Sequence, residues 1–222
     1  MPQSRWVIVF AKAPVHGRVK TRLASQVGEA AATRIYRRMA ERLWTMLLTA
    51  KAEEGFRLGL AFDPPGSAVA MRAWLPRADA YLPQAAGNLG DRIAEGCGFA
   101  LDSGAKAVTV IGSDCPGLSM RHLAQGFEAC RSRPLALGPA DDGGFYALTL
   151  TPEARALLPR LPALPWSSPL TGARLLESAS RLGLESALLP PLRDLDTLED
   201  LAFHRRLFPW IDGFSDPGPC PF

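Results

Sequence analysis

A basic segment follows the first apolar run of the chain. FAKAPVHGRVKTRL, residues 10–23, overlaps the end of WVIVFA and carries four cationic side chains: Lys12, Arg18, Lys20 and Arg22. Such side chains form charge-assisted hydrogen bonds to phosphate oxygens, and Gly17 allows close approach of the backbone. With a single glycine, the segment matches neither G-x-x-x-x-G-K-[ST] nor G-x-G-x-x-G. It is compatible with a phosphate-binding loop and equally with a solvated loop leading into a helix.

A first acidic segment follows a later apolar run. In VTVIGSDCPGL, residues 108–118, Asp114 stands just beyond a predicted buried strand. A carboxylate at this position can hold Mg²⁺ or Mn²⁺ against a diphosphate, because hard cations take oxygen ligands and bridge phosphate oxygens. Taken alone, Asp114 is more simply a helix cap or part of a turn.

A second acidic segment, ADDGGF, spans residues 140–145. Asp141 and Asp142 are adjacent, which is costly unless a cation or a hydrogen-bond donor neutralises them. Gly143 and Gly144 allow a bend and close approach of the backbone, although a plain hairpin turn also fits the segment. Three segments with charged side chains, each following a predicted strand, favour a binding site over three unrelated turns.

Two further segments carry weaker signals. PWSSPLTGARLLE, residues 165–177, contains a predicted helix start. Its polar residues either bind the polar groups of an acceptor or an anion there, or only cap the helix. Its candidate residues are Trp166, Ser168, Thr171 and Arg174. In LRDLDTLEDL, residues 192–201, Asp194 and Asp196 precede a helix, and a capping role is the simplest interpretation.

The elements that must position these residues alternate between short apolar runs and segments of helical period. The predicted strands are residues 6–11, 57–62, 107–112, 135–140 and 144–150. An amphipathic helix is predicted around residues 31–47, and Asn88, Ser119, Thr151-Pro152 and Thr197 mark further helix starts. This order predicts an α/β fold with a mostly parallel sheet and helices on both faces, in which ligands bind at the carboxyl ends of the strands.

Composition excludes several classes of function. The chain has 222 residues, of which 47% are hydrophobic, so we expect one domain over residues 1–210 and an irregular tail over 211–222. A net charge of +3 gives no general basic field for nucleic acid, and no run approaches the roughly 20 apolar residues that span a bilayer. Four separated cysteines, without zinc-site spacing, predict a reduced, cytoplasmic protein. Oligomeric state cannot be predicted from these features.

Taken together, five ordered motifs resemble a bacterial family of glycosyltransferase-A-type proteins, formerly a domain of unknown function. The motifs are FAKAPVHGRVKTRL, GSDCPGL, ADDGGFYAL, PWSSPLTGARLLE and LRDLDTLEDL, and the resemblance runs from Val7 to Leu201. Some members of that family are described as arsenosugar-biosynthesis glycosyltransferases. The resemblance implies a nucleotide-diphospho-sugar transferase fold with a Rossmann-like mixed sheet, a nucleotide-sugar donor and a small-molecule acceptor.

The resemblance also implies roles for individual residues. The nucleotide and its phosphates would be held by Lys12, Gly17, Arg18, Lys20, Arg22, Gly143 and Gly144. Asp114 occupies the place of the metal-binding motif, which implies Mg²⁺ or Mn²⁺, but Ser113-Asp114 supplies one carboxylate where D-x-D has two. Asp141 and Asp142 match the second acidic motif, on the sugar or acceptor side, where one of them would act as general base.

Two alternative functions remain open. The segment DLDTLEDL is similar to the D-x-D-T-x-E-D-L endings of guanylyl- and cytidylyltransferases, which transfer a nucleotidyl group from a nucleoside triphosphate and release pyrophosphate. Both kinds of transferase need cationic groups that oppose the charge developing on a diphosphate, so the fold alone does not choose between them. A degenerate protein that binds nucleotides without turnover is the third possibility.

Overall fold

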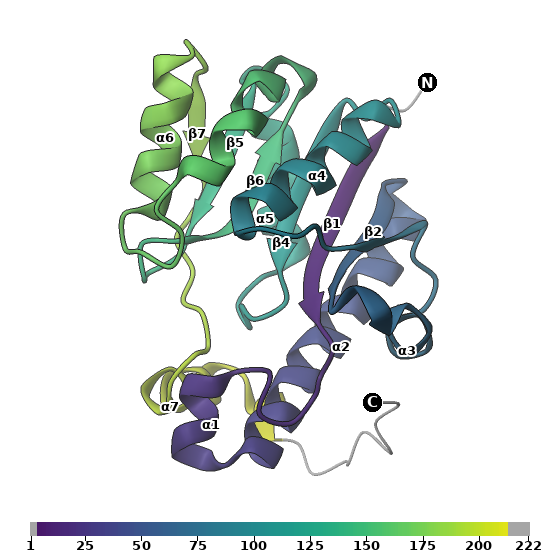
Figure 1. The fold of residues 1–222 in the computed structure, drawn as a ribbon, viewed down its shortest axis with the longest axis vertical. Coiled ribbons are helices and arrows are strands. Elements are labelled where there is room, and N and C mark those ends of the chain that lie inside the picture. Colours follow the sequence, from purple (N-terminus) through teal and green to yellow (C-terminus); the bar gives the residue numbers. More distant parts are fainter. Residues whose placement is uncertain (1–3, 213–222) are drawn as a thin grey trace.

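The apolar runs predicted as strands form a single mixed sheet in the computed structural model, which describes residues 4–212 (Figure 1). The strand order within these residues is β3-β2-β1-β4-β6-β5-β7. The strands are β1 (Arg5–Lys12), β2 (Arg57–Asp63), β3 (Ala80–Pro83), β4 (Ala107–Gly112), β5 (Leu135–Pro139), β6 (Phe145–Leu150) and β7 (Ser186–Leu188). Neighbouring strands are parallel except at β6, which runs antiparallel to β4 and β5.

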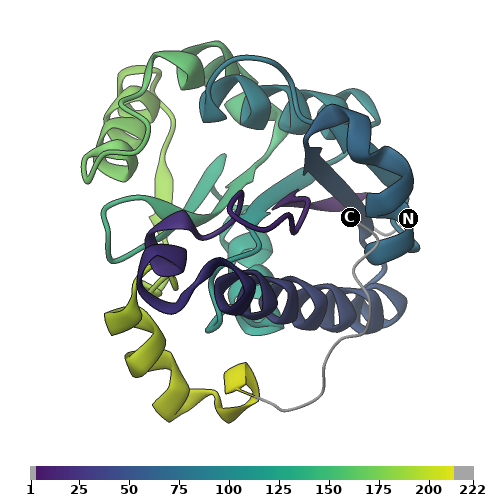
Figure 2. The same cartoon turned by 60° about the horizontal axis from the view of Figure 1, so that its bottom comes forward.

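Helices cover both faces of the sheet, as Figure 2 shows with α2 below it and α4 above. The α-helices are α1 (Thr21–Val27), α2 (Glu29–Glu54), α3 (Ala68–Trp74), α4 (Leu89–Asp102), α5 (Met120–Ala129), α6 (Thr171–Arg181) and α7 (Leu198–Leu207). The 3₁₀ helices are η1 (Pro65–Ser67), η2 (Pro152–Ala163) and η3 (Pro209–Asp212). Among the described residues no helix is long and apolar enough to span a membrane.

Two hydrophobic clusters, one on each face, hold the layers together. Val7 and Val9 of β1 pack in a cluster with the buried side chains of α1, α2, α3, α5 and α7. Trp6 and Ile8 of the same strand pack on the opposite face with α4, α6 and η2. Because successive side chains of a strand point to opposite faces, a central strand that is buried on both faces must be apolar throughout. This requirement explains the unbroken apolar run at the start of the sequence.

The predicted α/β class with a mostly parallel, mixed sheet is confirmed, and all five predicted strands are present within two residues of their expected bounds. The sequence analysis did not predict β3 and β7, which have only four and three residues and lie at the two edges of the sheet. The segment after Thr151-Pro152 forms a 3₁₀ helix, because Pro159 and Pro162 inside it cannot donate hydrogen bonds.

The expected helix starts at Asn88 and Thr197 are confirmed as capping boxes, with Asp91 and Asp200 closing them. The predicted tail, residues 211–222, begins within η3, and its residues 213–222 lie outside the described residues. The single-domain organisation over residues 1–210 stays a prediction.

Gly90 fixes how closely α4 packs against η2. A Cβ atom at this position would lie 2.3 Å from the backbone oxygen of Leu161, whereas a Cβ at Gly98 of the same helix would meet nothing within 4 Å. We therefore expect Gly90→Ala to lower the free energy of unfolding by about 1–3 kcal/mol through overpacking. Gly98→Ala should instead raise it by about 0.5–1 kcal/mol, because alanine favours the helix. Urea unfolding of both variants measures the difference, and equal effects would contradict this account of α4 packing.

Candidate active site

A cleft of ≈ 710 Å³ opens at the carboxyl ends of β1 and β4. These two strands are adjacent and parallel, and the chain leaves β1 toward β2 on one side while β4 lies on the other. Ligands of open α/β sheets bind at such a change of direction. The segment after β1, the segment after β4 and the segment before α7 all contribute side chains to the cleft.

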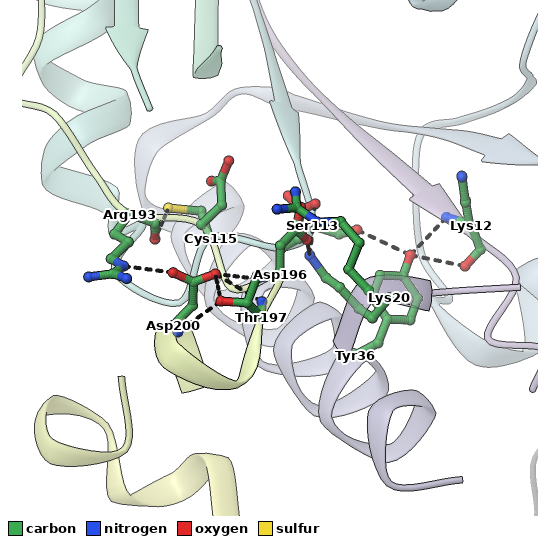
Figure 3. Close-up of polar contacts among 12 residues, drawn as sticks. Lys12, Lys20, Tyr36, Ser113, Cys115, Arg193, Asp196, Thr197 and Asp200 are labelled. Atoms are coloured by element: carbon green, nitrogen blue, oxygen red, sulfur yellow. Dashed lines mark hydrogen bonds and ion pairs between the residues drawn. The ribbon is translucent and has the colours of Figure 1, made fainter. Parts of the chain in front are cut away.

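Lys20 lies at the centre of the cleft and joins these three segments (Figure 3). Its Nζ donates hydrogen bonds to Oδ2 of Asp114 at 3.1 Å and to Oδ1 of Asp196 at 2.6 Å. Only 5% of the Lys20 side chain is exposed. The residue has φ 47° and ψ 47°, a left-handed conformation that is uncommon outside glycine. It is the N-cap of α1, so this conformation lies where the loop after β1 meets that helix.

The charges of this group depend on one another. Burial acts to lower the pKa of Lys20, but the attraction of Asp114 and Asp196 outweighs it and leaves that pKa raised. The Lys20 ammonium in turn holds the pKa of Asp114 below its usual range. Lys20 is therefore a permanent cation, and Asp114 a permanent carboxylate, across the physiological pH range.

Asp194 adds a further carboxyl group to the cleft. Burial, together with the negative charge of Asp114, raises the pKa of Asp194 to about 8. The backbone around it lies along the Asp114 segment, since Leu195 N donates to the Asp114 carbonyl at 3.1 Å. The single carboxylate of Ser113-Asp114 thus gains acidic neighbours from a distant part of the sequence.

Tyr36 of α2 ties the ends of β1 and β4 together beneath the cleft (Figure 3). Its hydroxyl donates to Lys12 O at 3.0 Å, accepts from Lys12 N at 2.8 Å and lies 3.2 Å from Ser113 Oγ. Burial raises the pKa of Tyr36 to about 12, so the hydroxyl stays protonated and able to donate.

The segment that carries Asp196 is fixed by the capping box of α7. Asp200 Oδ2 accepts hydrogen bonds from the backbone N–H groups of Asp196 at 3.1 Å and Thr197 at 2.9 Å. Arg193 Nε donates to the other oxygen of Asp200 at 2.7 Å. The capping contacts of α7 therefore also fix the backbone of Asp196, whose side chain contacts Lys20.

The other half of the cleft combines aromatic and amide side chains. Arg92 Nη1 donates to Gln84 Oε1 at 3.0 Å, and Gln84 Nε2 donates to the Ala61 carbonyl at 3.0 Å. Arg92 Nε is buried with no hydrogen-bond partner in the described part of the chain. The rings of Phe145 and Trp166 meet edge to face, with centroids 5.9 Å apart. Sequence reasoning missed Gln84, which directly follows the unpredicted strand β3, and Arg92, which lies in the expected helix α4 where nothing local marks it as a cleft residue.

The structure brings six of the predicted site residues into the lining of this cleft: Lys12, Arg18, Lys20, Arg22, Asp114 and Trp166. Lys12, Arg18 and Arg22 are exposed, and Arg22 also lies 3.7 Å from Asp196. Gly17 has φ 72° in the loop between them, in the left-handed region that favours glycine.

Asp141 and Asp142 lie in the exposed turn between β5 and β6 rather than in the lining of the cleft. Asp142 Oδ1 accepts from Gly144 N at 2.8 Å, and the charge of Asp142 contributes to the raised pKa of Asp194. Gly143 has φ 86° and packs so closely that a Cβ would lie 2.0 Å from Pro169 O. Their predicted roles stay predictions.

Ser168, Thr171 and Arg174 likewise stand outside the cleft lining. Thr171 Oγ1 donates to the Pro165 and Ser168 carbonyls, at 2.7 and 2.8 Å, and so braces the loop that carries Trp166. Arg174 pairs with Glu177 at 2.6 Å on the exposed face of α6. An acceptor role for these three residues remains a prediction.

The carboxylates of the cleft have donor chemistry that suits a hard divalent cation. Within residues 4–212 no three His, Cys, Asp or Glu side chains are arranged as a ready metal site. Mg²⁺, however, is usually held by one or two carboxylates together with substrate phosphates. Asp114 and Asp196 fit a cation that binds with a phosphorylated ligand, rather than one held by the protein alone.

Comparison with known proteins places the chain in a family. Residues 46–168, more than half of the chain, match the family described as uncharacterized proteins conserved in bacteria, DUF2064. The chain belongs to this family. The match bears out the sequence resemblance to a bacterial family of this kind. No curated protein matches the chain.

Solved structures extend the relationship. A protein of Desulfovibrio desulfuricans G20, described as a "putative nucleotide-diphospho-sugar transferase", is 26% identical with a TM-score of 0.81, over 91% of this chain and 87% of that one. The 4-diphosphocytidyl-2C-methyl-D-erythritol synthase of Anaerococcus prevotii DSM 20548 is 12% identical with a TM-score of 0.61, over 94% and 100%. Rv0371c of Mycobacterium tuberculosis H37Rv, in complex with manganese, is 17% identical with a TM-score of 0.50, over 93% and 98%. The last two show a shared fold.

Asp194 makes stability depend on pH. Its folded-state pKa of about 8 exceeds the value of about 3.9 expected in the unfolded chain, so the folded protein binds the extra proton between these values. The contribution of Asp194 to stability should therefore fall as pH rises from 4 to 8. Asp194→Asn removes this loss. We therefore expect the difference in unfolding free energy, variant minus wild type, to be about 1–3 kcal/mol more positive at pH 9 than at pH 4.

Urea unfolding at pH 4, 6.5 and 9 measures this difference. Glu95→Gln is the matched control, because Glu95 is an exposed carboxyl on α4 outside the cleft lining. If Asp194→Asn and Glu95→Gln show the same pH dependence, Asp194 is not protonated in the folded protein.

Proposed function

We propose that this protein is a transferase that binds a nucleotide-sugar in the cleft and moves its glycosyl group to a small acceptor. The observation that carries the proposal is the buried Lys20 ammonium between Asp114 and Asp196, at the carboxyl ends of β1 and β4. This arrangement places a fixed cation where ligands of such sheets bind. The 26% identity to the Desulfovibrio protein supports a nucleotide-diphospho-sugar as the donor class.

The basic side chains of the cleft would hold the donor's diphosphate. Lys12, Arg18 and Arg22 line the cleft with exposed side chains, while the Lys20 side chain is buried. In glycosyl transfer the bond between the sugar and the diphosphate breaks, and negative charge develops on the leaving nucleoside diphosphate. Cations that the fold gathers in the cleft stabilise that charge, and electrostatic stabilisation of this kind is a large source of catalysis.

A divalent cation would bind at Asp114 with Asp196, and a cation bound there would oppose the same charge as a Lewis acid. Mg²⁺ and Mn²⁺ fit because both take carboxylate and phosphate oxygens. The manganese complex of Rv0371c is a property of that protein, which shares the fold.

The half of the cleft around Arg92 and Trp166 would take the nucleoside. Its aromatic side chains offer surfaces for a base. The charge of Asp142 acts on Asp194 of the cleft, which supports a position of the β5–β6 turn where it would meet the acceptor. Asp141 or Asp142 would then take the proton of the acceptor hydroxyl as general base.

Nucleotidyl transfer from a nucleoside triphosphate is the second candidate. The observation that favours it is the position of Asp196, because the segment resembling nucleotidyltransferase endings contributes this side chain to Lys20. The two reactions differ in their products. Glycosyl transfer releases a nucleoside diphosphate, whereas nucleotidyl transfer releases pyrophosphate.

The test is thermal unfolding against nucleotide-sugars, nucleoside diphosphates and nucleoside triphosphates, each with and without Mn²⁺. A ligand at 100 times its dissociation constant should add about 2.7 kcal/mol of stability. We expect the largest stabilisation from one nucleotide-sugar, and release of nucleoside diphosphate when an acceptor is supplied. Preference for a triphosphate with pyrophosphate release would establish the second candidate. Binding without turnover would indicate a degenerate site, and no stabilisation by any compound would overturn the proposal.

The basic segment predicts which side chains matter for binding. Arg18→Ala and Arg22→Ala should each weaken the best nucleotide ligand about tenfold or more, because a hydrogen bond to a charged group contributes about 1.5–3 kcal/mol. Arg34→Ala is the matched control, since Arg34 is exposed on α2 outside the cleft lining. Isothermal titration calorimetry gives the affinities. If all three variants bind alike, the basic segment is a solvated surface loop.

A further inference from the structure

We propose that Lys20 competes with a divalent cation for Asp114 and Asp196, and that a bound diphosphate releases the two carboxylates by drawing the Lys20 ammonium to itself. The first half concerns the protein and metal alone. The second half rests on the proposed function, because it requires a diphosphate ligand in the cleft.

The contacts show that Lys20 occupies the position between the two carboxylates. Its Nζ lies 3.1 Å from Asp114 and 2.6 Å from Asp196, within direct hydrogen-bond distance of both. The Lys20 side chain is 5% exposed, whereas those of Asp114 and Asp196 are 43% and 38% exposed. The two carboxylates are thus open to the cleft on one side and joined by the ammonium on the other.

Electrostatics makes the two cations alternatives. A divalent cation that bridges the two carboxylates would lie close to the Lys20 ammonium, and like charges at short range repel. Lys20 already contacts Oδ2 of Asp114 and Oδ1 of Asp196, so a metal that bridges these two oxygens takes the place of the ammonium. Metal binding to the ligand-free protein in this bridging position therefore displaces Lys20, and it is weakened by the free energy of the Lys20 contacts.

A diphosphate changes this balance because it offers Lys20 other acceptors. Lysine carries its charge on a flexible four-carbon stem, and its three N–H donors can turn from carboxylate to phosphate oxygens. Lys12, Arg18 and Arg22 line the same cleft and would hold the diphosphate within reach of that stem. Coupling between two ligands is reciprocal, so the metal should also strengthen nucleotide binding.

The test compares Lys20→Met with Lys12→Met. Both variants remove one positive charge from the same cleft, but only Lys20 lies between the carboxylates, since Lys12 makes no side-chain contact with Asp114 or Asp196 among the described residues. Mn²⁺ binding to each nucleotide-free protein is measured by electron paramagnetic resonance. We expect Lys20→Met to bind Mn²⁺ at least about fivefold more tightly than the wild type, the lower end of the usual range for coupled sites. Lys12→Met should change Mn²⁺ affinity by much less.

A second variant, Lys20→Gln, keeps a side-chain N–H donor toward the carboxylates and replaces Lys20→Met if the latter does not fold. Equal Mn²⁺ affinity of the Lys20 and Lys12 variants, or weaker binding by the Lys20 variant, would overturn the competition. Metal-free nucleotide binding tests the second half, and we expect the Lys20 variant to lose about tenfold or more in affinity. The Lys12 variant also loses a phosphate contact, but only the Lys20 variant should combine weaker nucleotide binding with tighter Mn²⁺ binding. If no nucleotide binds the wild type, the proposed function fails while the Mn²⁺ comparison still decides the competition.

Discussion

The cleft depends on one buried charge. A lysine side chain with 5% exposure keeps its charge only when carboxylates neutralise it, and Lys20 contacts Asp114 and Asp196, which lie 94 and 176 residues away in the sequence. This requirement joins the loops after β1 and β4 to the segment before α7. The geometry of the site is therefore a consequence of neutralising Lys20, and each loop is held by a different neighbouring element.

Those neighbouring elements use ordinary structural contacts for a second purpose. Tyr36 belongs to the buried face of α2, yet its hydroxyl fixes the backbone of Lys12 and lies beside Ser113. Asp200 closes the capping box of α7, and the same carboxylate orients the backbone of Asp196. Because these contacts also stabilise the fold, the backbone segments that carry the charged side chains are positioned before any ligand arrives, which favours electrostatic stabilisation of a reaction.

The sequence was sufficient to predict the central strands, the long helix and the edge of the sheet where Lys20 and Asp114 meet, since apolar period and strand ends are local signals. It was insufficient for Asp196, which was interpreted most simply as a helix cap because nothing local to residues 192–201 indicates a partner at Lys20. Gln84 and Arg92 were missed for a related reason. Gln84 follows β3, whose four residues at the sheet edge give too short a pattern to recognise, and Arg92 lies in the expected helix α4, where nothing local indicates a cleft.

The reversed strand β6 has a consequence for how the cleft can move. Because β6 runs antiparallel to its neighbours, the β5–β6 turn emerges at the same edge of the sheet as the ends of the parallel strands. Gly143 O accepts from Gly172 N at 2.9 Å, and Gly143 packs directly on Pro169. The acidic turn and the loop that carries Trp166 are therefore packed together, so a closure of that loop over a ligand would move the acidic turn with it.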